Sequence, residues 1–103
     1  MPKTTKAASK AQPEKLADVP VEKRFYSNDG RILNNLEELV SALKVMSDQT
    51  FRYHVNESKN DFANWIADVI GDDKLAADLR KVTSCGETGK VVAARVAYHK
   101  GKK

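Results

Sequence analysis

The sequence has 103 residues, of which 41% are hydrophobic and 31% are charged, and its formal net charge is +4. A chain of this length predicts a single domain and excludes an enzyme built from separate cofactor and substrate domains. No uncharged stretch approaches the roughly 20 apolar residues that span a bilayer, so we expect no membrane association.

Two further features bear on the compartment in which the protein works. The N-terminus is basic, but no apolar stretch follows it as in a secretory signal. The single cysteine, Cys85, cannot form an internal disulfide, which fits a reducing compartment. We therefore expect a cytoplasmic protein.

The positive charge is concentrated at the two ends of the chain. Residues 1–24 carry a net charge of +3 and residues 82–103 a net charge of +4, whereas residues 25–81 carry −3. Lysine-rich segments can neutralise phosphates and release counterions without a shaped groove. The charge layout thus favours a protein that holds a polyanion. Short basic ends also occur on proteins that bind no polyanion, where they only increase solubility.

The N-terminal third of the chain changes character near residue 24. Residues 1–23 are rich in Ala, Lys, Thr and Pro and predict a disordered basic arm. The sequence Asn28-Asp29-Gly30 then supplies the residues of a tight turn between short extended segments. This pattern predicts a small β-hairpin or turn that lays Phe25, Ile32 and Leu33 on the helices.

Two helices are predicted next. Asn34 or Asn35 can cap the first, whose apolar residues recur at helical spacing up to Met46, where we expect it to end. Ser47 and Asp48 offer a cap for a second, short helix that ends near residue 55.

The third and fourth predicted helices complete a compact four-helix unit. Ser58 and Asp61 approximate a capping box at the start of the third, and Gly71 suits the left-handed position that ends it. Asp72 or Asp73 then starts the fourth, which ends near residue 82. The linkers are short, so neighbouring helices must pack against each other.

The chain after residue 82 is ambiguous. Two glycines precede the segment 90–99, which is rich in β-branched residues, and Gly-Lys-Lys ends the chain. We expect residues 83–103 to form a basic C-terminal segment that is a strand or disordered. The predicted organisation is therefore a mainly α domain at 24–82 between flexible basic arms at 1–23 and 83–103.

Ten large apolar residues are expected to form the core because they recur at helical spacing or sit in the hairpin. They are Phe25, Leu36, Leu39, Leu43, Phe51, Phe62, Trp65, Ile66, Val69 and Leu79.

The densest polar cluster surrounds His54. In one interpretation His54 and either Glu57 or Asp61 form an acid and base pair, because a carboxylate beside an imidazole fixes its tautomer. In the other, His54 closes a short helix while Ser58 and Asp61 cap the next one. We favour capping, since it accounts for each residue type by its position.

Other chemistries have weaker signals. His54, Asp61 and Cys85 are the remaining combination for a metal site, because the chain has no paired Cys or His motif. The segment Gly86 to Lys90 lacks the spacing of a phosphate loop. A helix-turn-helix reader is disfavoured because Asp61 and Asp68 on the would-be recognition helix would repel phosphates.

Several motifs occur in a distinctive order between residues 25 and 81: Asp29-Gly30-Arg31-Ile32-Leu33, Leu36-Glu37-Glu38-Leu39, Phe51-Arg52-Tyr53-His54, Asp61-Phe62-Ala63-Asn64-Trp65-Ile66, Gly71-Asp72 and Leu75-Ala76. Together they resemble a small domain of unknown function found in archaea and bacteria. The resemblance implies a small helical module that is sometimes attached to larger proteins. It implies no catalytic residue, because no activity is established for that family.

We expect a small, non-catalytic protein whose lysine-rich arms hold the phosphate backbone of DNA or RNA without sequence specificity, and we expect no cofactor or metal. Eleven of the eighteen basic side chains lie outside residues 25–81, which favours this function. The alternative is an adaptor whose helical body docks on a partner protein. The residues predicted to contact nucleic acid are Lys3, Lys6, Lys10, Lys90, Arg95, Lys100, Lys102 and Lys103.

Overall fold

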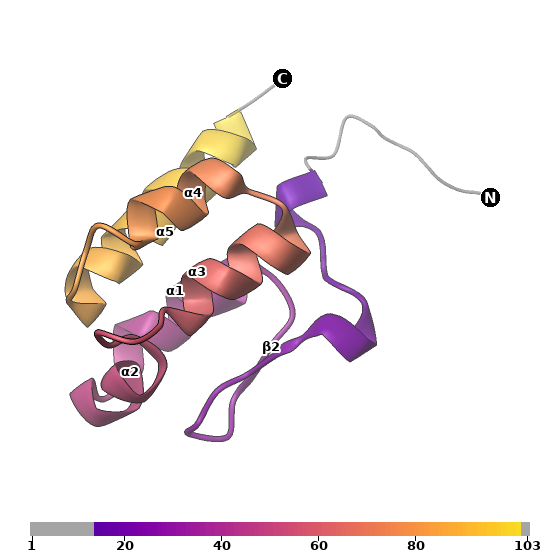
Figure 1. Cartoon of the computed structure of the whole chain (residues 1–103). Helices are drawn as coiled ribbons and strands as arrows, with labels where there is room; N and C mark the ends of the chain where they lie inside the picture. The colour runs from indigo at the N-terminus through magenta and orange to yellow at the C-terminus, as the bar shows by residue number, and fades with distance from the viewer. Residues whose placement is uncertain (1–13, 102–103) are drawn as a thin grey trace.

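The computed structural model describes residues 14–101, and this part of the chain is mainly helical with a short hairpin beside the helices (Figure 1). The prediction of a mainly α fold with an N-terminal hairpin is confirmed. The elements are η1 (Glu14–Leu16), η2 (Val21–Lys23), β1 (Phe25–Tyr26), β2 (Ile32–Leu33), α1 (Leu36–Val45), α2 (Asp48–His54), α3 (Asp61–Trp65), η3 (Ile66–Ile70), α4 (Asp73–Leu79) and α5 (Cys85–Gly101).

The first described residues correct, for their part of the chain, the prediction of a disordered arm at 1–23. Residues 14–23 contain two short 3-10 turns, η1 and η2, while residues 1–13 lie outside the described part of the chain. Leu16 and Val19 are half-buried against the core, and the Val19 N–H donates to the Asn34 carbonyl oxygen at 2.8 Å. Composition alone missed this because two apolar side chains find their partners in distant segments.

Strands β1 and β2 pair antiparallel, with Phe25 opposite Leu33 and Tyr26 opposite Ile32. The turn between them uses Gly30 at φ 96°, a left-handed conformation that glycine adopts without strain. Side chains alternate between the two faces of a strand, so Phe25 and Leu33 are buried while Tyr26 and Ile32 are exposed. The expectation that Ile32 packs on the helices is therefore wrong.

Helices α1 and α2 begin at the caps that the sequence indicates. The Asn35 side chain accepts a hydrogen bond from the Glu38 N–H, and the Ser47 hydroxyl accepts one from the Thr50 N–H. Each cap satisfies a backbone donor that the first turn of a helix leaves without a partner.

Helix α3 starts two residues later than the predicted capping box at Ser58. Asn60 is the cap, and its side chain accepts from the Ala63 N–H at 3.0 Å. The Ser58 N–H instead donates to the Asn56 side chain inside the preceding turn, at 2.9 Å. α3 continues into η3, a π-helical turn that ends at Gly71 with φ 82°, as predicted.

Helix α4 is capped by Asp72, one of the two predicted residues. The following segment corrects the expectation of strand or disorder, because residues 85–101 form α5. The Ser84 hydroxyl accepts from the Glu87 N–H, as the side chain of an N-cap does, and it donates to the Glu87 carboxylate. Such a cap fixes the start of a helix in spite of the glycines that follow it.

Helices α1 and α5 pack antiparallel. Lys100 near the end of α5 pairs with Glu37 at the start of α1, while Cys85 at the start of α5 donates its thiol proton to the Leu43 carbonyl near the end of α1. The buried face of α5 consists of Thr88, Val92, Val96 and His99.

The core lies between the hairpin and the five helices. Nine of the ten predicted core residues are buried, and the tenth, Val69, is half-buried. The Trp65 ring is buried and its Nε1–H donates to the Lys23 carbonyl oxygen at 2.8 Å, which ties the helices to the segment before the hairpin. Across the described residues, no helix has the length and apolar character to cross a membrane.

Candidate functional site

The cluster around His54 is a buried junction of three segments. Nδ1 lies 3.0 Å from Asp61 Oδ2, and Nε2 lies 2.9 Å from the Asn28 backbone nitrogen in the hairpin turn. Because the Asn28 N–H can only donate, Nε2 must accept, and Nδ1 carries the proton that it donates to Asp61. The ring itself is 3% exposed and packs against Phe25 and Phe62.

This geometry confirms neither interpretation in full: the His54–Asp61 pair of the first is present, whereas the second is wrong about the caps, because Asn60 and not Ser58 or Asp61 caps α3. Of the two carboxylates considered, Asp61 contacts the imidazole, while no such contact joins Glu57 to it within the described residues. Burial raises the pKa of Asp61, but hydrogen bonds from His54 and Lys59 outweigh this and hold the pKa below its usual range. With both ring nitrogens engaged by the protein, the imidazole offers no atom to a substrate.

A second polar cluster, formed by Asp72, Arg95 and His99, joins α4 to α5. Arg95 donates from Nε to Asp72 Oδ2 at 2.8 Å and from one terminal nitrogen to Oδ1 at 3.1 Å, while His99 Nε2 donates to Oδ2 at 2.8 Å. The Asp72 carboxylate also accepts the Leu75 N–H as the cap of α4. We call these three residues the Asp72 network.

Electrostatics strongly favour the ionised form of Asp72. The carboxylate is buried, which raises its pKa, but the hydrogen bonds from Arg95, His99 and the Leu75 N–H outweigh this and lower the pKa to about 2. The sequence reasoning did not find this network. The signal was the spacing of Arg95 and His99, four residues apart on one helical face.

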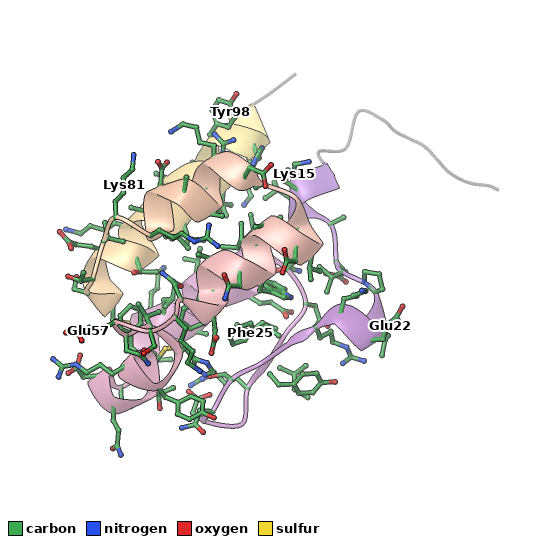
Figure 2. The ribbon with its side chains drawn as sticks, in the orientation of Figure 1. Lys15, Glu22, Phe25, Glu57, Lys81 and Tyr98 are labelled. Carbon is green, nitrogen blue, oxygen red and sulfur yellow. The ribbon has the colours of Figure 1, made fainter. Side chains whose placement is uncertain are left out.

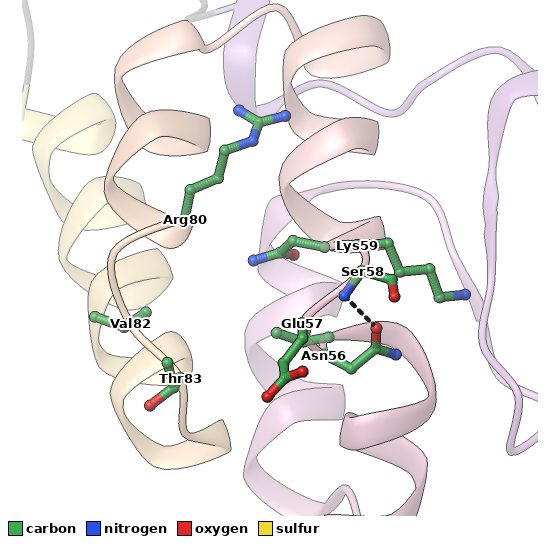
Figure 3. A pocket seen from close by; sticks show the side chains of 9 residues that line it. Asn56, Glu57, Ser58, Lys59, Arg80, Val82 and Thr83 are labelled. Atoms are coloured by element: carbon green, nitrogen blue, oxygen red, sulfur yellow. Dashed lines mark hydrogen bonds between the residues drawn. The ribbon is translucent and has the colours of Figure 1, made fainter.

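A groove of about 440 Å³ lies between the loop before α3 and the loop after α4 (Figure 3). Most of its polar side chains already have partners. The Asn60 side chain donates to the Leu79 carbonyl oxygen, and Arg80 donates to the Asn64 side chain at 2.9 Å. These contacts hold the two loops in place, so the groove presents few polar groups to a ligand.

The three residues considered for a metal site do not form one cluster, because His54 contacts Asp61 while Cys85 lies elsewhere in the fold. Cys85 lies against α1. Burial raises the pKa of its thiol, and the nearby Asp48 carboxylate raises it further. Within residues 14–101 no group of three or more His, Cys, Asp or Glu side chains could hold a metal ion.

Three of the eight predicted nucleic-acid contacts lie in the described part of the chain. Lys90 is exposed on α5, Lys100 is exposed and pairs with Glu37, and Arg95 belongs to the Asp72 network with 21% of its side chain exposed. The guanidinium of Arg95 therefore has a structural partner. The other five residues are Lys3, Lys6, Lys10, Lys102 and Lys103, which lie outside the described residues.

The first and the last described residues lie on the same side of the molecule. η1 packs on α1 and on α5. Lys15 Nζ lies 3.8 Å from the position that a Cβ on Gly71 would occupy, and the neighbouring Asp72 contacts His99 in the last turns of α5. Figure 2 shows Lys15 and Tyr98 at this end. We call it the terminal end.

Tyr98, which the sequence reasoning did not single out, is 51% exposed at the terminal end. The Arg95 guanidinium lies over its ring, 4.5 Å from the ring centre. The only sequence signal was an aromatic residue placed shortly before the Gly-Lys-Lys end of the chain.

Comparisons with protein-family models, with curated proteins and with solved structures find no match to this chain. The resemblance to a small archaeal and bacterial domain stays a prediction from the motifs alone.

Proposed function

We propose that this protein is a small, non-catalytic nucleic-acid-associated protein that contacts phosphate backbones through its lysine-rich ends. The observation that carries the proposal is the terminal end, since residues 14 and 101 both lie there. Segments 1–13 and 102–103, which contain five lysines and no acidic residue, are therefore attached to the same side of the body.

The net charge of residues 14–101 also supports binding through the terminal segments rather than through the helical body. Residues 14–101 contain thirteen basic and fourteen acidic side chains, so their net charge is −1. The full chain carries +4, and the excess resides in the five lysines of the attached segments. A phosphate backbone would be attracted to these segments more strongly than to the body.

The test compares two five-site variants of the full chain that have the same net charge of −1. In the first, Lys3, Lys6, Lys10, Lys102 and Lys103 are changed to Gln. In the matched control, five exposed basic residues of the body are changed to Gln: Lys23, Lys44, Arg52, Lys74 and Lys81.

Binding to a DNA duplex is measured at several salt concentrations. If about half of the predicted contacts engage phosphates, log affinity falls against log salt with a slope near −3 to −4, at about −0.9 per phosphate. We expect the first variant to lose most of this slope and the control to keep it. Equal losses in both variants would show that only net charge matters.

One observation favours the adaptor as a second candidate. Tyr26 and Ile32 face each other on the outer face of the hairpin and are 61% and 45% exposed. An exposed apolar pair of this kind suits contact with a protein partner. A full chain that binds no nucleic acid at low salt would leave this candidate in place of the first.

A further inference from the structure

We propose that protonation of His54 releases the hairpin turn, residues 27–31, from the helices against which it lies. The inference does not depend on the proposed function, because neither the ring nor the turn carries a predicted nucleic-acid contact. His54 ends α2, and Figure 1 shows the turn before β2 at the same end of the molecule as α2. The turn is thus anchored at a side chain that can change its charge.

In the described part of the chain, one hydrogen bond ties the turn to the helices. The Asn28 N–H donates to His54 Nε2 at 2.9 Å. The other hydrogen bonds of the turn stay inside it: the Ser27 N–H donates to the Arg31 carbonyl oxygen, and the Gly30 N–H donates to the Ser27 carbonyl oxygen, each at 2.9 Å. Asn28 and Gly30 are exposed, so the turn can move into solvent without opening the core.

The bond to Asn28 exists only while the ring is neutral. Nε2 accepts the Asn28 N–H through its lone pair, while Nδ1–H donates to Asp61 Oδ2 at 3.0 Å. A proton taken from solvent binds at Nε2, and the imidazolium then has a hydrogen on both nitrogens and no lone pair. Two donors would face each other at 2.9 Å, so the turn has to move away.

The charged groups around the ring allow both states inside the fold. The Asp61 carboxylate on α3 keeps its bond to Nδ1–H and stabilises a positive ring, while the Lys59 ammonium on the same oxygen, at 2.9 Å, opposes it. On the turn itself, Asp29 pairs with Arg31 at 3.3 Å, which leaves little net charge there. The other side chains packed against the ring are the uncharged aromatic rings of Phe25, Tyr53 and Phe62.

The hairpin is the element that the change of charge affects. Strands β1 and β2 have two residues each, and a two-stranded hairpin is marginally stable without support from its surroundings. Loss of the anchor at the turn therefore weakens the strand pairing as well, while the caps of the helices remain in place. The two states are a docked turn on a neutral ring and a free turn beside an imidazolium that is paired with Asp61 alone.

The experiment is an NMR titration of the isotope-labelled full chain from about pH 8 to about pH 4.5, which contains the ordinary titration range of histidine. The shifts of the His54 ring nitrogens report protonation. Hydrogen-exchange protection of the Asn28 amide reports docking of the turn, and that of the Glu38 amide, which the Asn35 side chain caps in α1, is the internal control. The chain is compared with His54→Gln, which does not titrate, and with His99→Gln, which removes the other buried histidine.

We expect the protection of the Asn28 amide to fall by about tenfold or more, because its hydrogen bond to a buried ring is lost. The midpoint of this fall should coincide with protonation of the His54 ring, and the Glu38 amide should keep its protection. His54→Gln should abolish the transition at Asn28, whereas His99→Gln should retain it.

Four results would overturn the inference. The Asn28 amide keeps its protection while the His54 ring takes up a proton, it loses protection together with the Glu38 amide, it loses protection equally in His54→Gln, or the ring takes up no proton before the chain unfolds. Circular dichroism checks that each variant folds. If His54→Gln does not fold, the three results that concern the unaltered chain still decide the question.

Discussion

At the scale of single residues, the Thr88 side chain places a hydroxyl in the core without a hydrogen-bond partner among the described residues. The residue is 1% exposed on the buried face of α5, and its Oγ1 makes no hydrogen bond within the described chain. A buried polar group in this state costs about 1–3 kcal/mol. Valine has nearly the same shape and lacks the hydroxyl.

Thr88→Val should therefore raise the free energy of unfolding by about 1 kcal/mol, measured by urea denaturation. Thr83→Val, at an exposed position in the loop before α5, serves as the control and should change stability by less than about 0.5 kcal/mol. A destabilised Thr88→Val would mean that the hydroxyl has a partner in solution.

The His54 site shows what residue patterns can and cannot predict. The pattern correctly offered Asp61 as a partner of His54 but wrongly offered it as a cap, since Asn60 caps α3. The contact with the Asn28 N–H, 26 residues away, was beyond prediction because it depends on how the hairpin turn lies on α2. The same limit applies to the Asp72 network, whose members are 23 and 27 residues apart.

At the scale of elements, α5 is where the prediction failed, and the reason is local. The β-branched residues of segment 90–99 favour a strand by propensity, yet the Ser84 hydroxyl caps a helix start by accepting the Glu87 N–H. Thr88, Val92, Val96 and His99 follow at helical spacing and are all buried. Packing against α1 overrides the weak strand propensity.

Two glycines in this part of the fold should respond to alanine in opposite directions. Gly86 lies in the first turn of α5 with open space around its Cβ position, so Gly86→Ala should stabilise the protein by about 0.5–1 kcal/mol. Gly71 has φ 82°, where an alanine is strained, so Gly71→Ala should destabilise by about 1 kcal/mol or more.

Thermal and urea denaturation of both variants measure this difference. Each variant makes the same chemical change, and the two therefore control for each other. A loss of stability in Gly86→Ala would show that the start of α5 is not helical.

At the scale of the whole molecule, the Asp72 network couples stability to pH. The pKa of Asp72 falls from 3.8 to about 2 on folding, so the folded state binds a proton less readily than the unfolded state. The resulting stabilisation is fully present above about pH 4 to 5 and is lost as the pH falls through about 2. At about 1.4 kcal/mol per pKa unit, it amounts to about 2 kcal/mol.

Urea denaturation between pH 5 and pH 2 should accordingly show a fall in the free energy of unfolding, to which Asp61 contributes in the same direction. In Asp72→Asn this fall should shrink by about 2 kcal/mol. Asp73→Asn, which removes the exposed carboxylate one residue further along, is the matched control. An acid dependence that is the same in Asp72→Asn as in the unaltered chain would contradict the assignment.

The helices and caps of the fold were largely predictable, whereas the arrangement of the ends was not. Asn35, Ser47 and Asp72 are caps that each depend on a residue three positions away, which a sequence displays. The packing of η1 on α5 joins residues at least 69 positions apart, and nothing in the local pattern around Leu16 specifies it.

The shared position of residues 14 and 101 also has a consequence for engineering. A linker between them would close the described chain into a ring, and new ends could then be opened at the exposed hairpin turn around Gly30. The same arrangement lets the body be inserted into a surface loop of a host protein without separating the two halves of that loop.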